Sequence, residues 1–400
     1  KSFVLDETKD ICKFENYIKK VDGTADRGIS PSTVYFLSFK KGTTYKNHKI
    51  DKAVFKVFVG VWGQGDDEEK EMLNKLVTEV LIYKHFISPI IDQRLCPNFI
   101  RYLGSGVCSV SNILNNGRHD QYVAILALDY IEDSMTLYEM LKLTDDEKKQ
   151  FQDNKDNYNM YNEILVDAKK LRFGDVNYYY PRTYNILLHP ERYITILFHI
   201  LCAQYVMNCV YMYNDDMHIN NIMVKKLKKP RIIKYIYGGE TFIITTLYDV
   251  KVFDFDRASV KAWENKRIKR YLGRHSSARR AVRDLIGIYK HENNSVPLYN
   301  KIYEILKKNK KGGTLEAMEY VRDQSPSLFL QDDAKFDEEY ICNPELAAIN
   351  VPDSVVKKNK KNNNTRKKMV AGLLLAGSAT ALLVKLRTSG KRNENTIYQN

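Results

Sequence analysis

The sequence predicts an α+β fold with two lobes, a small lobe rich in strands followed by a mostly helical one. Runs rich in Val, Phe and Tyr at 33–39 and 53–59 are typical of strands. Apolar residues at helical spacing behind an acidic start predict a helix over 66–86. Further short strands are expected near 99–103 and 122–129. A chain of 400 residues is long enough for two such lobes with extensions.

Helical patterns dominate the second half of the chain, with one clear exception. Gly238-Gly239 separates two apolar runs and predicts a β-hairpin that pairs 231–237 with 241–246. A polar, Tyr-rich stretch over about 144–180 indicates an insertion or an extended loop. The predicted helices cover 194–211, 278–289, 299–307 and 314–323.

Positive charge is concentrated at the C-terminal end. Residues 355–400 hold eleven Lys or Arg against one Glu, a net of +10, so the rest of the chain carries only +4 of the total of +14. This distribution argues against nucleic acid as a partner of the body. The six cysteines are scattered without a C-x-x-C pair or metal-ligand spacing, which predicts reduced thiols.

An uncharged stretch near the C-terminus predicts a membrane anchor. Residues 369–384 contain no charged side chain, and a transmembrane helix is expected over 369–386. A basic linker at 351–368 precedes this segment, and a basic tail at 387–400 follows it. More Lys and Arg precede than follow, which favours the body on the cytoplasmic side. The alternative is a buried or interfacial helix.

Three oxygen-bearing side chains form the pattern that phosphoryl transfer requires. Asp216 and Asn221 lie in a polar loop that leads into an apolar run, and Asp254 follows another apolar run. The reaction needs metal ions on the phosphates and a carboxylate that orients the attacking hydroxyl. Carboxylate and amide oxygens suit Mg²⁺, a hard cation. The sequence therefore predicts Asp216 as the catalytic base and Asn221 and Asp254 as metal ligands.

The spacing Asp216-x-x-x-x-Asn221, followed by Asp254-Phe255-Asp256, resembles the catalytic loop and the metal-binding Asp-Phe-Gly motif of the protein kinase superfamily. The resemblance implies ATP and Mg²⁺, with Mn²⁺ as a further option, as cofactors. It implies transfer of the γ-phosphoryl group to a serine or threonine hydroxyl of a protein substrate.

Further parts of the kinase pattern occur upstream in the same order. Ala53-Val54-Phe55-Lys56 resembles the strand-lysine motif, which implies that Lys56 binds the α- and β-phosphates. Glu79 resembles the glutamate that holds this lysine. The other implied positions are Gly28, Ser30 and Val34 in the phosphate-covering loop, Asp129 and Ile131 in the adenine-binding hinge, Leu128 as gatekeeper and Asp284 as a brace beneath the catalytic loop.

The resemblance also implies a domain organisation. A bilobal protein kinase-like fold would place a β-rich N-lobe at 1–128 and a hinge with a mostly helical C-lobe at 129–350. The hydrophobic C-terminal tail lies outside this catalytic body.

Several positions depart from the kinase pattern. The phosphate-covering loop keeps one glycine, Gly28, while Asn214 and His218 stand where the family has histidine and lysine. Asp256 replaces the last glycine of Asp-Phe-Gly. His218 is a candidate either for the missing lysine's electrostatic role in catalysis or for a structural hydrogen bond in the loop. In these departures the sequence resembles the divergent kinases of large DNA viruses, the haspin-like kinases and the small-molecule kinases of the choline and aminoglycoside type.

The prediction is therefore a Ser/Thr protein kinase anchored in a membrane, located in the host cytoplasm or in a virion. The abundance of Asn, Lys, Ile and Tyr favours a viral source with an AT-rich genome. Two alternatives stay open. One is a pseudokinase scaffold or structural virion protein, and the other is a small-molecule kinase.

Overall fold

The computed structural model describes two compact units. The first contains the described residues up to Ser88 together with Arg101–Tyr130, and the second contains Pro89–Ile100 and the described residues from Ile131 onwards. Residues 89–100, which the sequence places in the first lobe, thus belong to the second unit. The described residues are 3–4, 18–26, 32–45, 48–61, 67–109, 121–142, 189–214, 216–260, 281–282, 297–308 and 313–343.

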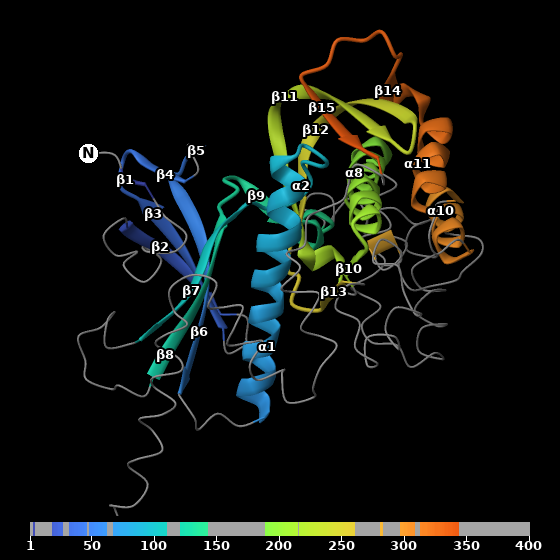
Figure 1. Ribbon diagram of the computed structural model, residues 1–400. Coiled ribbons are helices and arrows are strands. Elements are labelled where there is room, and N and C mark those ends of the chain that lie inside the picture. The colour runs from blue at the N-terminus through green and yellow to red at the C-terminus, as the bar shows by residue number, and fades with distance from the viewer. Residues whose placement is uncertain are drawn as a thin grey trace, which may run out of the picture. The chain divides into compact units, whose positions relative to one another are not determined.

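A five-stranded antiparallel sheet is the largest element of the first unit (Figure 1). The strands predicted at 33–39, 53–59 and 122–129 are confirmed as its three central strands. The strand expected near 99–103 begins later, at Tyr102. In spatial order the strands are β2 (Ile18–Asp26), β3 (Ser32–Phe39), β6 (Lys52–Val61), β8 (Gln121–Asp129) and β7 (Tyr102–Ser109).

Side chains alternate between the two faces of this sheet. Leu37, Phe55 and Ile125 belong to one buried apolar cluster on one face. Lys56 and Phe58 lie one and three residues after Phe55 on β6. Because side chains alternate along a strand, both point toward the opposite face. This alternation places Lys56 on the face that the helix of the first unit covers.

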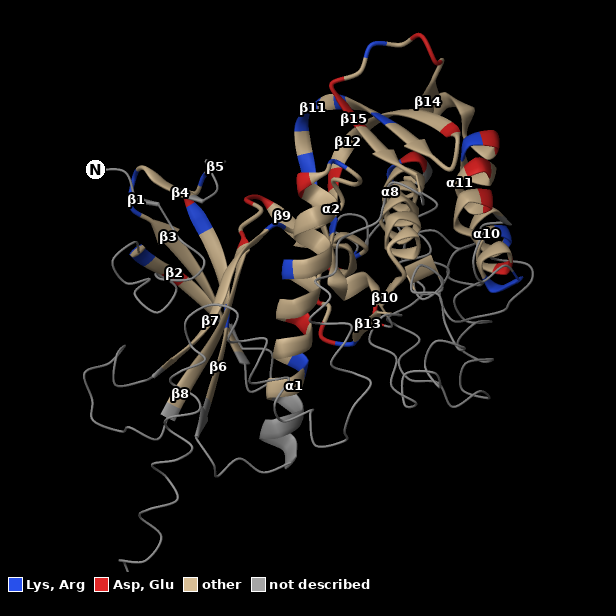
Figure 2. Cartoon of the chain, viewed as in Figure 1, with Lys and Arg blue, Asp and Glu red and all other residues tan. Residues whose placement is uncertain are grey.

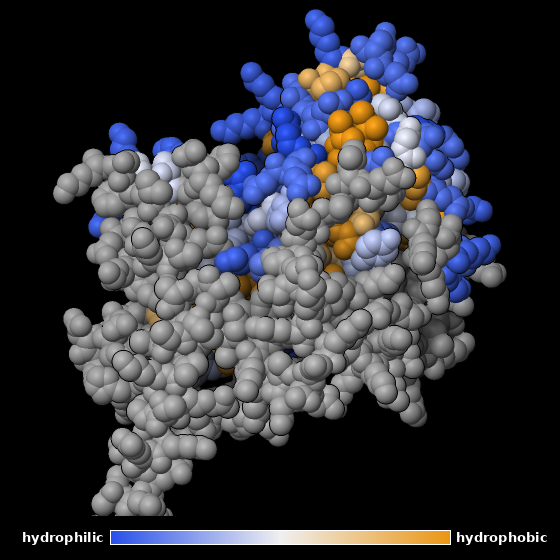
Figure 3. All heavy atoms as spheres, viewed as in Figure 1, coloured by the Kyte–Doolittle hydropathy of each residue, from blue (hydrophilic) through white to orange (hydrophobic). Residues whose placement is uncertain are grey.

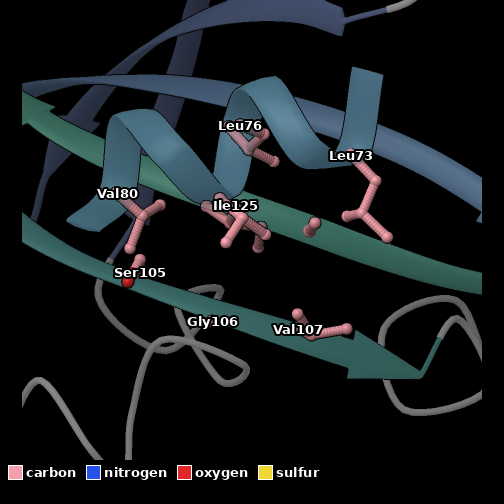
Figure 4. A pocket seen from close by; sticks show the side chains of 9 residues that line it. Leu73, Leu76, Val80, Ser105, Gly106, Val107 and Ile125 are labelled. Carbon is pink, nitrogen blue, oxygen red and sulfur yellow. The ribbon is translucent and has the colours of Figure 1, made fainter. Parts of the chain in front are cut away.

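Helix α1 (Asp67–Ile82) covers that face along β7 and β8 (Figure 4). Leu73, Leu76 and Val80 recur at helical spacing and line a small cavity opposite Ser105 and Val107 of β7. Its volume is about 10 Å³, roughly the space that one water molecule requires, and its lining is apolar. The helix is therefore packed closely onto the sheet.

The helix extends beyond the predicted end at 86. Helix α1 continues through a π-helical turn over Tyr83–Ile87 into helix α2 (Ser88–Asp92). Phe86, Ile87 and Ile90 are fully buried, so the apolar pattern persists past the predicted boundary.

The first unit also contains a small three-stranded sheet and, among its described residues, a disulfide-bonded cysteine. The sheet consists of β1 (Phe3–Val4), β4 (Thr43–Tyr45) and β5 (His48–Lys49). Cys108, buried on β7, is disulfide-bonded, so the prediction that all six cysteines are reduced is wrong. Pairing depends on which strands meet, and sequence spacing carries no record of that. The described free cysteines are Cys96, Cys202, Cys209 and Cys342.

Helix α8 (Pro190–Cys209) is the central helix of the second unit. Its side chains from Ile196 to Met207 are buried, as expected for a helix that is apolar on all sides. It starts four residues before the predicted start at 194, because Pro190 suits the first helical position.

A long β-hairpin forms the centre of the second sheet. The hairpin predicted at Gly238-Gly239 is confirmed, and both glycines have positive φ, +62° and +91°, as a type I′ turn requires. Its strands, β11 (Ile222–Tyr237) and β12 (Glu240–Val252), extend well beyond the predicted 231–237 and 241–246. The second unit thus contains more sheet than predicted, because apolar residues alternate with polar ones along almost the whole of both strands.

Three short strands complete this sheet. β15 (Glu338–Cys342) pairs with β11 in parallel, and β9 (Ser134–Thr136) pairs with the start of β11 in antiparallel fashion. β14 (Phe329–Leu330) pairs with β12 on the opposite side. Helix α4 (Leu137–Met140) follows β9 directly and begins with a capping box formed by Thr136 and Glu139.

Two of the predicted C-terminal helices are confirmed. They are α10 (Pro297–Lys308) and α11 (Gly313–Gln324), which pack against each other, and α11 also packs against α8. Of the helix predicted over 278–289, only 281–282 lie within the described residues, and they are helical and buried.

Several predicted segments lie outside the described residues. These are the insertion at 144–180, the basic linker at 351–368, the candidate transmembrane helix at 369–386 and the tail at 387–400. Within the part of the chain that the structure describes, no helix combines the length and the apolar character needed to cross a membrane.

Candidate active site

The first unit brings Lys56 and Glu79 together as predicted. Lys56 lies on β6 on the face covered by α1, and Glu79 lies on α1. The Lys56 Nζ is 2.7 Å from the Glu79 Oε2. The Glu79 side chain is 2% exposed and that of Lys56 is 20% exposed. Val34, the Cα partner of Lys56 on β3, is buried beside it. The result is an ammonium group fixed in position by a buried carboxylate.

The second unit holds Asp216 in a loop defined by backbone hydrogen bonds. The Asn214 side-chain oxygen accepts the Asp216 N–H at 3.0 Å. The Asp216 carbonyl accepts the His218 N–H at 2.8 Å. These bonds fix Asp216 through its backbone. The side chain is 10% exposed, so the carboxylate remains within reach of solvent.

Asn221 lies at the end of a 3₁₀ turn over Ile219–Asn221 and closes the same loop. Its side-chain nitrogen donates to the Asp216 carbonyl at 2.9 Å, and its backbone N–H donates to the His218 carbonyl at 2.8 Å. The residue is 2% exposed. With the amide nitrogen used as a donor inside the loop, the amide oxygen is the end of this side chain suited to a metal ion.

The hairpin brings Asp254 to Asn221. Ile222 and Val252 are Cα partners on β11 and β12, and the Phe253 N–H donates to the Asn221 carbonyl at 3.1 Å. Asp254 therefore follows directly after the residue bonded to Asn221. Its φ is +64°, a left-handed conformation that is uncommon outside glycine and is concentrated at functional sites.

Asn98 braces the strand that carries Asp254, a role the sequence did not reveal. Its side-chain nitrogen donates to the Val250 carbonyl at 2.9 Å, and its backbone carbonyl accepts the Val252 N–H at 2.9 Å. The neighbouring Phe99 forms a parallel bridge to Val252 and packs its ring 6.2 Å from that of Phe255. The available signal in the sequence was a polar residue directly after Cys96-Pro97. Only the fold shows that this residue is buried and contacts β12.

Two basic side chains flank the Asp216 carboxylate. The His218 Nε2 is 3.8 Å from Oδ2, and the Arg257 Nη1 is 3.6 Å from Oδ1. His218 also accepts the Asn220 N–H through Nδ1 at 3.2 Å, so it makes the structural hydrogen bond that the sequence left as one of its two roles. Both distances to Asp216 exceed those of strong hydrogen bonds.

Arg257 is a site residue that the sequence prediction missed. It precedes β13 (Ala258–Val260), which pairs with β10 (Met212–Asn214) so that Asn214 and Ala258 are Cα partners. That pairing places the turn before Ala258 beside the loop after Asn214. A basic residue directly after Asp254-Phe255-Asp256 was the signal in the sequence.

The remaining predicted site residues are less informative. Asp129 ends β8, and its N–H donates to the Arg101 carbonyl at 2.9 Å, so this donor is used within the first unit. The Ile131 carbonyl accepts a hydrogen bond from Ser134 at 2.6 Å. Leu128 is buried on β8. Gly28, Ser30 and Asp284 lie outside the described residues.

The donors around Asp254 fit a magnesium ion. Asn221 and Asp254 offer one amide oxygen and one carboxylate, the hard oxygen ligands that Mg²⁺ prefers. Among the described residues there is no cluster of three or more His, Cys, Asp or Glu that could hold a metal by itself. A site with so few protein ligands suits a metal whose other ligands are phosphate and water oxygens.

Comparisons with known proteins find similar chains among the solved structures. No protein-family model and no curated protein matches the chain. Among solved structures, a MAP kinase from Leishmania major is similar at 11% sequence identity with a TM-score of 0.35, over 92% of this chain and 81% of that one. So slight a likeness does not assign the chain to a family.

Proposed function

We propose that this chain is a kinase-type phosphotransferase that moves the γ-phosphoryl group of Mg-ATP to a hydroxyl group of a protein, with serine or threonine as the acceptor. The observation that carries the proposal is the arrangement of Asp216, Asn221 and Asp254. One loop and one hairpin bring a partly accessible carboxylate, a buried amide and a second carboxylate to the same place. The proposed fold is that of a divergent bilobal protein kinase.

In the proposed reaction Asp216 acts on the acceptor. Its carboxylate accepts the proton of the attacking hydroxyl and directs the oxygen toward the phosphoryl group. The loop supports this role because Asn214 and Asn221 hold the Asp216 backbone, so the carboxylate has a defined position. Magnesium, when bound, neutralises the charge of the phosphates, and Asn221 and Asp254 are the residues proposed to hold it.

Lys56 is the residue proposed to bind the phosphate oxygens in the first unit. The ammonium group provides the positive charge that these oxygens require. Glu79 fixes its position at 2.7 Å. Because Lys56 keeps 20% of its side chain exposed, the charge is held but not fully enclosed.

The test is a phosphate-transfer assay with the purified full chain, Mg-ATP and a mixture of protein acceptors. We expect Asp216→Asn to reduce the rate of transfer by about 10²–10⁴-fold, the usual contribution of a positioned general base. The melting temperature should change little, since the backbone hydrogen bonds of the loop do not use the carboxylate. Asp333→Asn, at an exposed acid of the second unit, is the matched control and should transfer normally. Normal transfer by Asp216→Asn would exclude this residue as the base.

The same assay separates the two alternatives. Transfer to soluble alcohols such as choline or aminoglycosides, without transfer to proteins, would favour a small-molecule kinase. Binding of Mg-ATP, detected as thermal stabilisation, without any transfer would favour a pseudokinase scaffold or structural virion protein.

The membrane anchor at 369–386 and a location in the host cytoplasm or virion belong to the same proposal. Their support is the uncharged sequence of 369–384 between basic flanks. The test is flotation of the full chain with liposomes, compared with a chain that ends at residue 356. Equal flotation of both chains would exclude the anchor.

A further inference from the structure

Strand β11 has an open edge between two short partner strands. β9 pairs with Met223–Lys225, and β15 pairs with Ile233–Tyr237. β12 occupies the other side of β11, so β9 and β15 lie along the same edge. Ile232 is bonded to Asp337. Residues 226–231 therefore have no strand partner on this edge among the described residues.

The pairing on the other side of β11 is also interrupted here. The register with β12 shifts between Lys226 and Arg231, which leaves 227–230 outside the regular ladder. A shift of this kind bends a strand and turns side chains outward. The interrupted part of β11 coincides with a run of lysines.

Four lysines occupy this stretch, and we call 225–229 the lysine segment. Lys226, Lys228 and Lys229 are exposed, and Lys225 is half-buried. Figure 2 shows basic residues along this part of β11, and Figure 3 shows a largely hydrophilic surface on this side of the second unit. The segment is a compact patch of one charge sign.

The basic residues near the lysine segment are paired with carboxylates. Arg231 binds Asp249 and Glu338, Lys234 binds Glu339, and Lys251 binds Asp249, at distances of 3.0–3.4 Å. None of the four lysines of the segment has a carboxylate within ion-pair distance among the described residues. Their mutual repulsion is therefore uncompensated within the described structure, and a bound anion would relieve it.

We propose that the lysine segment binds an extended acidic stretch of the protein substrate, an inference that rests on the proposed phosphotransfer. Carboxylates complement the lysines, and the open edge offers backbone groups to which an extended peptide can add as a strand. The lysine segment contains no arginine and no aromatic residue. It therefore lacks the guanidinium forks and stacking surfaces with which proteins usually bind nucleic acid.

The position of the segment also fits a substrate site. β11 begins at Ile222, immediately after Asn221, and Lys226 and Lys229 follow Asn221 by five and eight residues. At about 3.3 Å per residue they lie at most roughly 16–26 Å from the catalytic loop along the strand. A single extended peptide of similar length can therefore reach both places.

Lysines at an open edge have a simpler role as well, because charge on an edge strand prevents sheets from joining edge to edge. That role makes a different prediction. Neutral or acidic substitution would then alter self-association, and binding of acidic peptides would be weak and independent of these residues.

The experiment uses the full chain and two fluorescent peptides that share one serine-containing segment. One peptide carries a run of glutamates six residues from the serine, and the other carries glutamines there. Binding is measured by anisotropy, and transfer is measured as separate kcat and KM values. We expect the glutamate peptide to bind about tenfold more tightly at low salt, as several exposed ion pairs would provide.

The decisive variant is Lys226→Glu/Lys228→Glu/Lys229→Glu. We expect it to lose the preference for glutamate and to raise KM for that peptide with kcat unchanged. The control, Lys41→Glu/Lys308→Glu/Lys335→Glu, changes the net charge equally at exposed sites elsewhere and should keep the preference. An unchanged preference in the first variant, or an equal loss in the control, overturns the proposal.

Three further outcomes separate this inference from nucleic-acid binding and from its premise. A single-stranded oligonucleotide could bind more tightly than the glutamate peptide and depend on the same lysines. That result would show that the segment binds nucleic acid and would overturn the acidic peptide as its ligand. If the glutamate peptide binds but no phosphate is transferred, the proposed phosphotransfer is wrong. The lysine segment is then not a substrate site. Transfer without a preference for glutamate would overturn only the docking surface.

Discussion

The two units hold their buried carboxylates in different ways. In the first unit Glu79 is 2% exposed and lies 2.7 Å from the Lys56 ammonium group. In the second unit the Asp216 side chain is 10% exposed, and its basic neighbours Arg257 and His218 lie 3.6 and 3.8 Å away. Glu79 is fixed by an opposite charge, while Asp216 is fixed mainly through its backbone.

This difference separates structural from chemical use of a carboxylate. A helix packed on a sheet offers few backbone donors, so a buried acid there needs a counter-ion. A loop offers free N–H groups and side-chain amides, and in this chain the side chains of Asn214 and Asn221 hold the Asp216 backbone. Removing a partner should therefore lower stability more in the first unit than in the second.

The largest effect on stability is expected from breaking the pair in the first unit. Lys56→Met would leave Glu79 buried without its ammonium partner, and we expect a loss of about 3 kcal/mol in the free energy of unfolding. Urea unfolding measures this change. The double variant Lys56→Met/Glu79→Leu removes both charges and should regain most of the loss. An unfolding midpoint equal to that of the parent in the single variant would contradict the contrast between the units.

A buried histidine sharpens the comparison, because it is kept uncharged. His199 on α8 is 1% exposed, and its Nδ1 lies 2.9 Å from the Tyr235 hydroxyl. Burial, together with Arg231, lowers the pKa of His199 from 6.5 to about 3. Below pH 6.5 the unfolded chain therefore binds a proton that the folded chain excludes, so stability is present above this pH and is lost as the pH falls toward 3.

We expect His199 to cost the fold about 2 kcal/mol between pH 6.5 and about pH 5, at 1.36 kcal/mol per unit. Urea unfolding at a series of pH values measures the slope. His199→Gln cannot titrate, and its stability should vary less over this range whatever its stability at neutral pH. A slope equal to that of the parent would show that other groups control the acid sensitivity.

The smallest effect is expected at Arg257. Its side chain is 56% exposed, and exposed ion pairs contribute roughly 0–1 kcal/mol, so Arg257→Gln should reduce kcat/KM by no more than about fivefold. The unfolding midpoint should not change. Arg257→Lys keeps the charge and should recover part of the activity. A loss as large as that of Asp216→Asn would mean that Arg257 contacts the reacting groups directly.

The sequence by itself determined the local elements and indicated the principal residues of the candidate site. Strong β-forming runs fixed β3, β6 and β8, and helical periodicity fixed α1, α8, α10 and α11. Gly238-Gly239 fixed the hairpin, because glycine takes the two successive positive φ angles of this turn at no steric cost. The motifs around Lys56 and Asp216 could be recognised because each lies within a single strand or loop, so the spacing of its residues is a local property of the sequence.

Only the tertiary structure decided which distant segments meet. Asn98 reaches the strand before Asp254, and Arg257 reaches Asp216, through pairings across 152 and 41 residues of sequence. The short strands β14 and β15 carry little pattern of their own and exist because β11 and β12 offer edges to pair with. The open stretch of β11 between β9 and β15 likewise depends on where its partners end. Local sequence sets the period of each element, whereas register and edge pairing depend on contacts between segments, which no local pattern records.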